Sequence, residues 1–316
     1  MDLLSDILAT LRLQGTLYFH TDFRPPWGLR VPQYRRVARF HLAVRGECWV
    51  RVEGAGPPFR LEAGDLALIT RGAEHVLADT PDTPCRTVDQ VVRESGFTGK
   101  GALVVGAPDA GSPTRLVCGH FAFDEEFRHP FLDQLPPAIV IRADDYADNP
   151  SLDDAFQLVA REVRAGRPGG NAVVTRLSEI LFVQAVRHWF ERAAADTGVV
   201  AAMNDPGLGK ALGAMHAEPA AAWTLELLGR TAAMGRTAFA ARFREIVGMT
   251  PMEYLTTWRI QLGKRLLGET RLSLDQIAAR VGYESSASFS RVFTREAGER
   301  PGAYRRRTGG AGLASV

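Results

Sequence analysis

The chain has little cysteine, no long apolar run and almost no net charge, and each shortage excludes a class of protein. Three cysteines, Cys48, Cys85 and Cys118, occur among 316 residues, which is too few for a disulfide framework and fits a reducing compartment. No stretch approaches the roughly 20 apolar residues of a membrane helix. The first fifteen residues lack the basic start of a secretory signal peptide. We therefore expect a cytoplasmic protein with no membrane partner.

The net charge of +2 hides an uneven distribution of charge along the chain. From Pro206 onward, 16 lysines and arginines face 9 aspartates and glutamates, a net charge of +7. The first 205 residues carry 22 basic and 27 acidic residues, a net charge of −5. Six of the arginines, against two glutamates, lie between Arg291 and Arg307. This excess indicates an anionic partner such as nucleic acid, although a merely solvated basic surface explains the charge equally well.

The length and the hydrophobic pattern predict an α+β protein of two domains. From Gly15 to about Ile141, short apolar or alternating runs are separated by Gly, Pro and Asp clusters, which is typical of a β-sandwich or barrel. Helical spacing follows, first from a cap at Ser151 or Asp153 and then from about 172 to 194. The second helix has a broad apolar band, so it packs on more than one side, either within the chain or against a second copy.

The strongest signal is an internal repeat in the last third of the chain. Its first copy, Phe239, Phe243, Gly248, Pro251 and Tyr254, recurs fifty residues later as Phe289, Phe293, Gly298, Pro301 and Tyr304. Thr224 and Ser273 are suited to cap the helices that precede each copy. Two Phe residues four apart mark a buried helical stripe, and the Gly suits the left-handed end of that helix. Each copy therefore predicts a helix-turn-helix unit.

In such a unit the second helix enters the major groove of DNA, with the face opposite the buried Phe residues toward the bases. Arginine can fork onto guanine, Ser and Thr reach bases or phosphates, and Ala allows contact with a thymine methyl. The predicted DNA-facing residues of the two units are Arg236, Thr237, Ala240, Ala241 and Arg244, and Ser286, Ala287, Ser290, Arg291 and Thr294.

The segment from Trp223 to Arg305 resembles the DNA-binding domain of the AraC/XylS family of transcription regulators. The resemblance is carried by DQIAARVGYESSASFSRVFTREAGERPGAYR in the second unit, LGRTAAMGRTAFAARFREIVGMTPMEYL in the first, and TTWRIQLGKRLL between them. It implies two helix-turn-helix units joined by one helix over about 252–267, which read successive major-groove segments. Gly235 departs from the family pattern, which has a capping Ser or Thr there.

The N-terminal part resembles the cupin-type sensor domain of one branch of this family. GDLALITRGAEH (residues 64–75) is similar to the second cupin motif, with Thr70 in place of its proline, and FHLAVRGECWV (residues 40–50) falls at the first motif. LVCGHFAFDEEFRHPFLDQLPP (residues 116–137) is similar to the end of the sensor domain. The resemblance implies a β-barrel that senses a small molecule.

The barrel could hold either an organic effector or a metal ion. His41, Trp49 and His75 are the candidates for lining an effector site, because such cavities are apolar with a few polar groups. His41, Glu47 and His75 could form a partial metal site, with Cys48, Cys118 and His120 as soft ligands nearby in sequence. Since the first motif holds one His instead of a His-x-His pair, we favour the effector, with no cofactor and no catalysis. Cys118 as a redox sensor is disfavoured, because no basic cluster flanks it.

These observations predict a sequence-specific DNA-binding transcription regulator that is controlled by a small-molecule effector. We expect an activator, although the residues leave the choice between activation and repression open. The expected divisions are a cupin-like sensor at 1–145, a helical linker and dimerisation region at 146–205, a double helix-turn-helix domain at 206–308 and a flexible tail at 309–316. The expected partners are double-stranded DNA, the effector, a second copy of the chain and, by family resemblance, RNA polymerase. The alternative is a metal-dependent cupin enzyme with a DNA-binding appendage.

Overall fold

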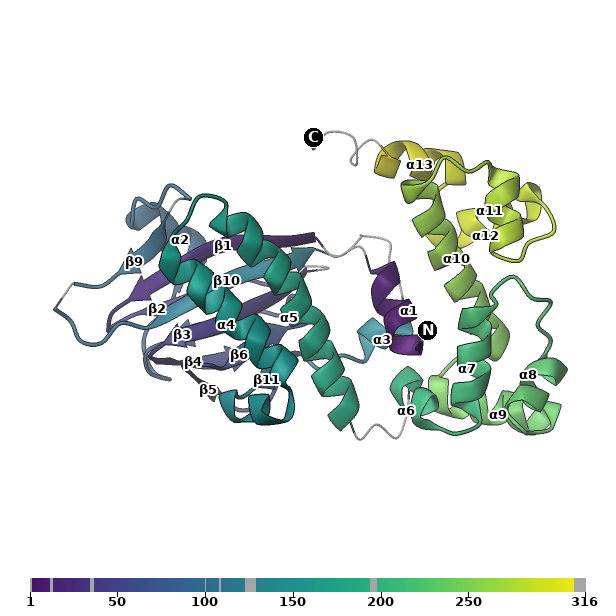
Figure 1. Ribbon diagram of the computed structural model, residues 1–316, viewed down its shortest axis with the longest axis horizontal. Coiled ribbons are helices and arrows are strands. Elements are labelled where there is room, and N and C mark those ends of the chain that lie inside the picture. The colour runs from purple at the N-terminus through teal and green to yellow at the C-terminus, as the bar shows by residue number, and fades with distance from the viewer. Residues whose placement is uncertain are drawn as a thin grey trace. The chain divides into compact units, whose positions relative to one another are not determined.

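The computed structural model describes residues 2–11, 14–34, 37–99, 101–107, 109–122, 129–193 and 198–309. They form two compact units, one of strands with two long helices and one of helices alone (Figure 1). The described parts of 12–125 and 135–192 make up the first, the sheet unit. The second, the helical unit, takes its residues from 1–11, 126–134 and 193–316. The expected α+β class with two domains is therefore confirmed. Within the described ranges, no helix is long and apolar enough to cross a membrane.

The sheet unit contains a six-stranded and a five-stranded sheet. The larger has the order β11-β6-β3-β10-β1-β9, with β1 at Gln14–Phe23, β3 at Val37–Arg45, β6 at Leu66–Ile69, β9 at Ala102–Val105, β10 at Arg115–Ala122 and β11 at Ala138–Ile141. The smaller has the order β5-β4-β7-β2-β8, with β2 at Gly28–Val31, β4 at Glu47–Val52, β5 at Phe59–Glu62, β7 at His75–Ala78 and β8 at Arg86–Thr87. Only the β1–β9 and β2–β8 pairs of these ladders are parallel.

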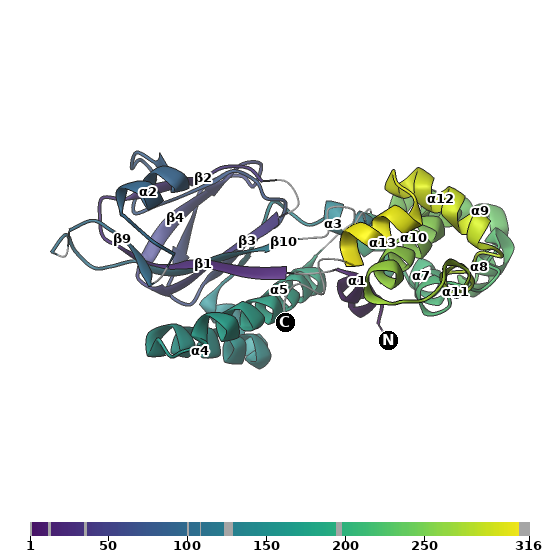
Figure 2. The same ribbon diagram turned by 90° about the horizontal axis from the view of Figure 1, so that it is seen from above.

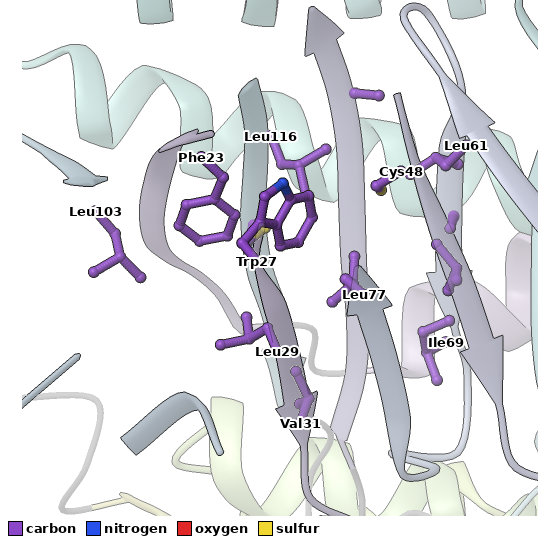
Figure 3. Close-up of a cluster of buried hydrophobic side chains, with 14 of the residues drawn as sticks. Phe23, Trp27, Leu29, Val31, Cys48, Leu61, Ile69, Leu77, Leu103 and Leu116 are labelled. Carbon is purple, nitrogen blue, oxygen red and sulfur yellow. The ribbon is translucent and has the colours of Figure 1, made fainter. Parts of the chain in front are cut away.

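Apolar side chains from both sheets fill the space between them (Figure 3). Phe23 and Trp27 pack with ring centroids 4.7 Å apart, and Leu29, Cys48 and Leu116 belong to the same cluster. The sheets are not closed into the barrel that we expected. The edge strands β5 and β8 have only four and two residues, so they offer few backbone groups for pairing with the larger sheet. Two facing sheets therefore enclose the core.

Two long helices follow the last strand. Helix α4 (Pro150–Ala165) is capped at Asn149, before the predicted cap at Ser151 or Asp153, because the Asn149 side chain accepts a hydrogen bond from the backbone N–H of Leu152 and Pro150 occupies the first turn. Gly166, with a φ of +57°, ends it. Helix α5 (Gly170–Arg192) contacts β1 and β11 and covers the outer face of the larger sheet (Figure 2). Helix α2 (Val88–Glu94) and the 3-10 helix η1 (Ala143–Asp148) complete the unit.

The helical unit contains the two predicted repeats. The first comprises α8 (Leu225–Thr231) and α9 (Arg236–Val247), the second α11 (Leu274–Arg280) and α12 (Ser286–Ala297), with α10 (Pro251–Glu269) between them and α13 (Pro301–Gly309) after them. Each repeat has its own hydrophobic cluster, built on Phe239 and Phe243 in one and on Phe289 and Phe293 in the other. Thr224 and Ser273 cap α8 and α11 as predicted. Gly248 and Gly298 end α9 and α12 in the left-handed conformation.

Two segments from the N-terminal half of the chain also belong to the helical unit. Helix α1 (Leu3–Thr10) contacts α7 (Leu208–Ala217) and α10, and α3 (Pro130–Asp133) contacts α6 (Gly198–Asn204). The region that we expected to form a separate linker, 146–205, is divided, because α4 and α5 pack on the sheet unit and α6 packs within the helical unit. Of the predicted tail, Gly309 belongs to α13, and residues 310–316 lie outside the described residues.

Candidate DNA-binding surface and candidate effector pocket

Helix α9 presents a polar face opposite its buried phenylalanines. Phe239 and Phe243 are fully buried, which turns the intervening positions outward. Of the predicted DNA-facing residues of this helix, Arg236, Thr237, Ala241 and Arg244 are exposed and Ala240 is half-buried. The predicted face therefore exists on the first unit. Gly235 caps this helix without a side-chain hydrogen bond, whereas Ser285 caps α12 through a capping box with Ser288.

Helix α12 repeats this arrangement with smaller side chains. Ala287 and Arg291 are exposed, and Ser286, Ser290 and Thr294 are half-buried. The Thr294 hydroxyl donates to the backbone carbonyl of Ser290 at 2.7 Å. This contact leaves only its acceptor lone pairs for an external donor.

The arginines on these two faces differ in their availability. Arg242 of α9 pairs with Asp205 at 2.6 Å, so part of its charge is neutralised. Arg236, Arg244 and Arg291 form no ion pair with any residue that the structure describes. Three guanidinium groups are therefore free to meet an anionic partner.

Beside α12 lies a basic depression. Of the four arginines that line it, only Arg291 is among the predicted DNA-facing residues. The depression has a volume of about 730 Å³, and Arg295, Arg300 and Arg306 line it together with Arg291. The excess of arginine between 291 and 307 was its only sequence signal, because the four side chains come from two helices and a turn. Their proximity suits a phosphate backbone.

In the sheet unit, two of the three predicted effector residues meet between the sheets. His41 lies on β3 and His75 on β7, both are buried, and their Nε2 atoms are 2.8 Å apart. His41 Nδ1 lies 3.2 Å from Cys118 Sγ, and His75 Nδ1 lies 2.9 Å from the carbonyl oxygen of Ala73. Residues 34 positions apart in sequence thus join one hydrogen-bonded chain across the two sheets.

The order of protons along this chain follows from its ends. A carbonyl only accepts, so His75 Nδ1 carries a proton and its Nε2 is an acceptor. His41 Nε2–H must then donate to His75, and the Cys118 thiol donates to His41 Nδ1. Burial lowers the pKa of His75 to about 4, with a smaller contribution from Arg39. Burial, the neighbouring His75 and Arg39 hold the pKa of His41 well below its usual value. Both imidazoles are neutral at pH 7.

A pocket of about 300 Å³ opens beside the hydrogen-bonded series His75–His41–Cys118. His41, Cys118 and Arg39 line one side, and Val88 and Val92 of α2 line another. Arg39 was absent from the predicted residues. An arginine in an alternating strand is usually exposed, and only the facing sheet shows that this one points inward.

Two other candidates, Trp49 and Glu47, lie elsewhere. Trp49 and Glu47 share the outward face of β4, while Cys48 and Val50 face the core, so neither predicted residue reaches the pocket. Glu47 pairs with Arg60 at the surface. The structure therefore separates Trp49 and Glu47 from His41, His75 and the pocket between the sheets. The separation arises because successive strand residues point to opposite faces.

The chemistry of the histidine pair also bears on metal binding. Two nitrogens bound tetrahedrally to one zinc ion would lie about 3.3 Å apart, so 2.8 Å fits a hydrogen bond better. Among the residues that the structure describes, no group of three or more His, Cys, Asp or Glu side chains is arranged to hold a metal ion. Burial raises the pKa of Cys48 to about 12 and raises that of Cys118, so neither buried thiol has the low pKa of a metal-binding or redox-active cysteine.

Comparison with known proteins finds one family in the N-terminal part of the chain and another in the C-terminal part. A family described as cupin matches residues 2–191, and a family described as a helix-turn-helix domain matches residues 228–307. A protein of Streptomyces lividans that bears the name of an AraC-like transcription regulator is 34% identical over 312 residues, which cover 97% of this chain and 98% of that protein. The chain belongs to the AraC-like transcription regulators.

Members of this family bind DNA and regulate transcription, and this chain is a DNA-binding regulator of the same kind. The transcriptional activator RclR of Escherichia coli, named as specific for RCS, is 28% identical over 97% of this chain and 98% of its own length. The solved DNA-binding domain of AdpA, in complex with a target DNA, is 29% identical over 35% of this chain and 99% of that domain. Its TM-score is 0.33.

Proposed function

We propose that this AraC-like regulator reads DNA with α9 and α12 and is controlled by a small molecule bound in the sheet unit, without catalysing a reaction. Arg236, Arg244 and Arg291 would make the charged contacts with DNA. Thr237, Ala240, Ala241, Ser286, Ala287, Ser290 and Thr294 would complete the surface. The observation that carries the proposal is the pair of separately packed helices whose outer faces present arginines without an ion pair among the described residues, two on α9 and one on α12.

The effector would enter the 300 Å³ pocket beside His41 and Cys118. Apolar walls with a few polar groups are typical of small-molecule sites. His75 would act through His41, because it meets that residue inside the sheet core and does not line the pocket. The regulator would work in the cytoplasm as an activator, and the family resemblance implies that it contacts RNA polymerase.

A second copy of the chain would pack against α5. Val173, Ile180 and Val183 are 46%, 48% and 36% exposed, and they lie on one side of this helix at spacings of seven and three residues. On α4, Leu158 is 45% exposed. Apolar side chains at helical spacing on an outer face are typical of a helix-helix interface.

The test of DNA reading starts from genomic fragments that the wild-type chain selects. Replacing Arg236 or Arg291 by Ala should weaken binding to the selected fragments by about 1–3 kcal/mol if each arginine forks onto a base. Binding to random DNA should change less. The control is Arg51→Ala, which removes an exposed arginine from β4 and should leave both affinities unchanged. Equal losses on selected and random DNA would make the two arginines phosphate contacts, and unchanged binding would remove α9 and α12 from the interface.

A further inference from the structure

The pocket in the sheet unit is built from one apolar side and one polar side. Leu29 and Val31 of β2 line it from the smaller sheet, and α2 packs against that strand (Figure 2). Val88 and Val92 of α2 and Phe97 beyond it complete the apolar side. A water molecule occupies about 30 Å³ in the liquid, so 300 Å³ holds an organic molecule of about ten non-hydrogen atoms.

The His41 imidazole, on the polar side, already uses both of its ring nitrogens in hydrogen bonds. His41 donates its one proton to His75 and accepts from Cys118, so a ligand meets a neutral ring with no remaining donor. Burial raises the pKa of Cys118, which keeps the thiol protonated as the donor to His41. The histidine chain therefore supplies polarity and rigidity but no charge.

Arg39 is the buried charge in this pocket. The residue is 6% exposed, and its guanidinium carbon lies 4.3 Å from the centroid of the Tyr34 ring. Its positive charge contributes to the lowered pKa values of His41, His75 and His120, so its field reaches the groups around the cavity. A guanidinium has five N–H donors, which allows it to hold a carboxylate and keep its other contacts.

We propose that this pocket binds a small organic acid, with the carboxylate on the Arg39 guanidinium and an apolar body against α2. The proposal rests on the proposed control by a small molecule and specifies its chemical class. The buried cation favours an anion over a neutral molecule of the same shape, because charge pairs interact more strongly away from water. Asp89 also lines the pocket but is exposed, so it lies at the mouth. Its negative charge disfavours a bound acid whose carboxylate points toward the mouth and favours one whose carboxylate points inward to Arg39.

The experiment compares acids with alcohols of the same carbon skeleton. The probes are octanoate with octan-1-ol and 3-phenylpropanoate with 3-phenylpropan-1-ol, each of about ten non-hydrogen atoms to suit the cavity. Calorimetric titration of the full chain at pH 7 should show each acid binding about ten- to a hundredfold more tightly than its alcohol, the range expected for hydrogen bonds to a charged group. Equal affinity within both pairs, or no binding of any probe by a cooperatively melting chain, would overturn the proposal.

Two variants assign the preference to Arg39. Arg39→Met should abolish the preference for the acid and leave the alcohol affinity within a few fold, and Arg39→Lys should retain part of the preference because it keeps a point charge. The matched control is Arg30→Met, on the outward face of β2 between two pocket residues, which should bind like the wild type. An acid preference that survives Arg39→Met would overturn the assignment. If Arg39→Met fails to fold, the ratio of acid to alcohol affinity in the wild type and the reduced ratio expected for Arg39→Lys still test the proposal.

DNA binding measured on the same preparation separates this proposal from the one on which it rests. A chain that binds selected DNA but shows no acid preference refutes the acid site alone. A chain that prefers acids, but whose DNA affinity is the same with and without octanoate and 3-phenylpropanoate, refutes control through this pocket and leaves the acid site in place.

Discussion

Acid should destabilise the helical unit through two buried histidines. His129 and His216 are 1% and 5% exposed, and the hydroxyl of Tyr254 lies between them, 3.3 Å from His129 Nε2 and 2.8 Å from His216 Nε2. His129 Nδ1 accepts from the backbone N–H of Phe131, so His129 Nε2–H donates to Tyr254 and the hydroxyl donates to His216. A proton added to His129 would therefore face the N–H of Phe131, and one added to His216 would face the hydroxyl of Tyr254, each of them already a donor.

The magnitude follows from the pKa values. Burial lowers the pKa of His129 to about 3, and burial with a smaller contribution from His129 lowers that of His216 to about 2. The unfolded chain titrates near 6.5, so it binds more protons than the folded chain between pH 6.5 and about 3, and stability falls as the pH falls through that window. From pH 7 to pH 5 the loss is about 2 kcal/mol for each histidine. Together they remove about 4 kcal/mol, a large share of a typical domain stability of 5–15 kcal/mol.

The assay is urea unfolding of the full chain at pH 7, 6 and 5, followed by circular dichroism. His129→Asn keeps an acceptor for the Phe131 N–H and removes one titrating group, so it should lose about 2 kcal/mol less than the wild type between pH 7 and pH 5. The control is Tyr254→Phe, which removes the shared hydroxyl but no titrating group at these pH values. It should lower stability by about 1–3 kcal/mol at every pH and leave the slope unchanged. Identical pH slopes in the wild type and His129→Asn would refute the reasoning.

Three further changes test the packing, the caps and the outer face of α5. Phe289→Ala should cost about 3–5 kcal/mol in urea unfolding of the full chain, because this fully buried ring centres the second cluster, and an unchanged unfolding curve would contradict its placement. Ser285→Ala should cost about 1 kcal/mol in the same assay, whereas Ser285→Thr, which keeps a side-chain acceptor at the cap, should cost less than half of that, and equal costs would refute the role of the side-chain cap. Ile180→Glu should convert dimers to monomers in sedimentation experiments without lowering the melting temperature, and a wild type that sediments as a monomer would remove α5 as an interface.

The helical unit could be predicted because its signals are local. Two Phe residues four apart define the buried side of a helix, and a left-handed Gly ends it, so Phe239 with Phe243 and Gly248 determine where α9 faces and stops. The same pattern fifty residues later predicts the second unit. In the sheet unit, the sequence predicts only a series of short runs, because strands of four residues such as β2, β5, β7 and β11 carry too little periodicity to stand out from loops.

The sequence by itself determined the family, the two-domain α+β class and the two recognition helices, since helix faces and caps depend on residues within a few positions of one another. Only the tertiary structure decided the pocket. It turned Trp49 outward and Arg39 inward, and it brought His41 and His75 from different sheets to within 2.8 Å. Which face of a strand is buried depends on the sheet that packs against it, and that contact joins residues distant in the chain.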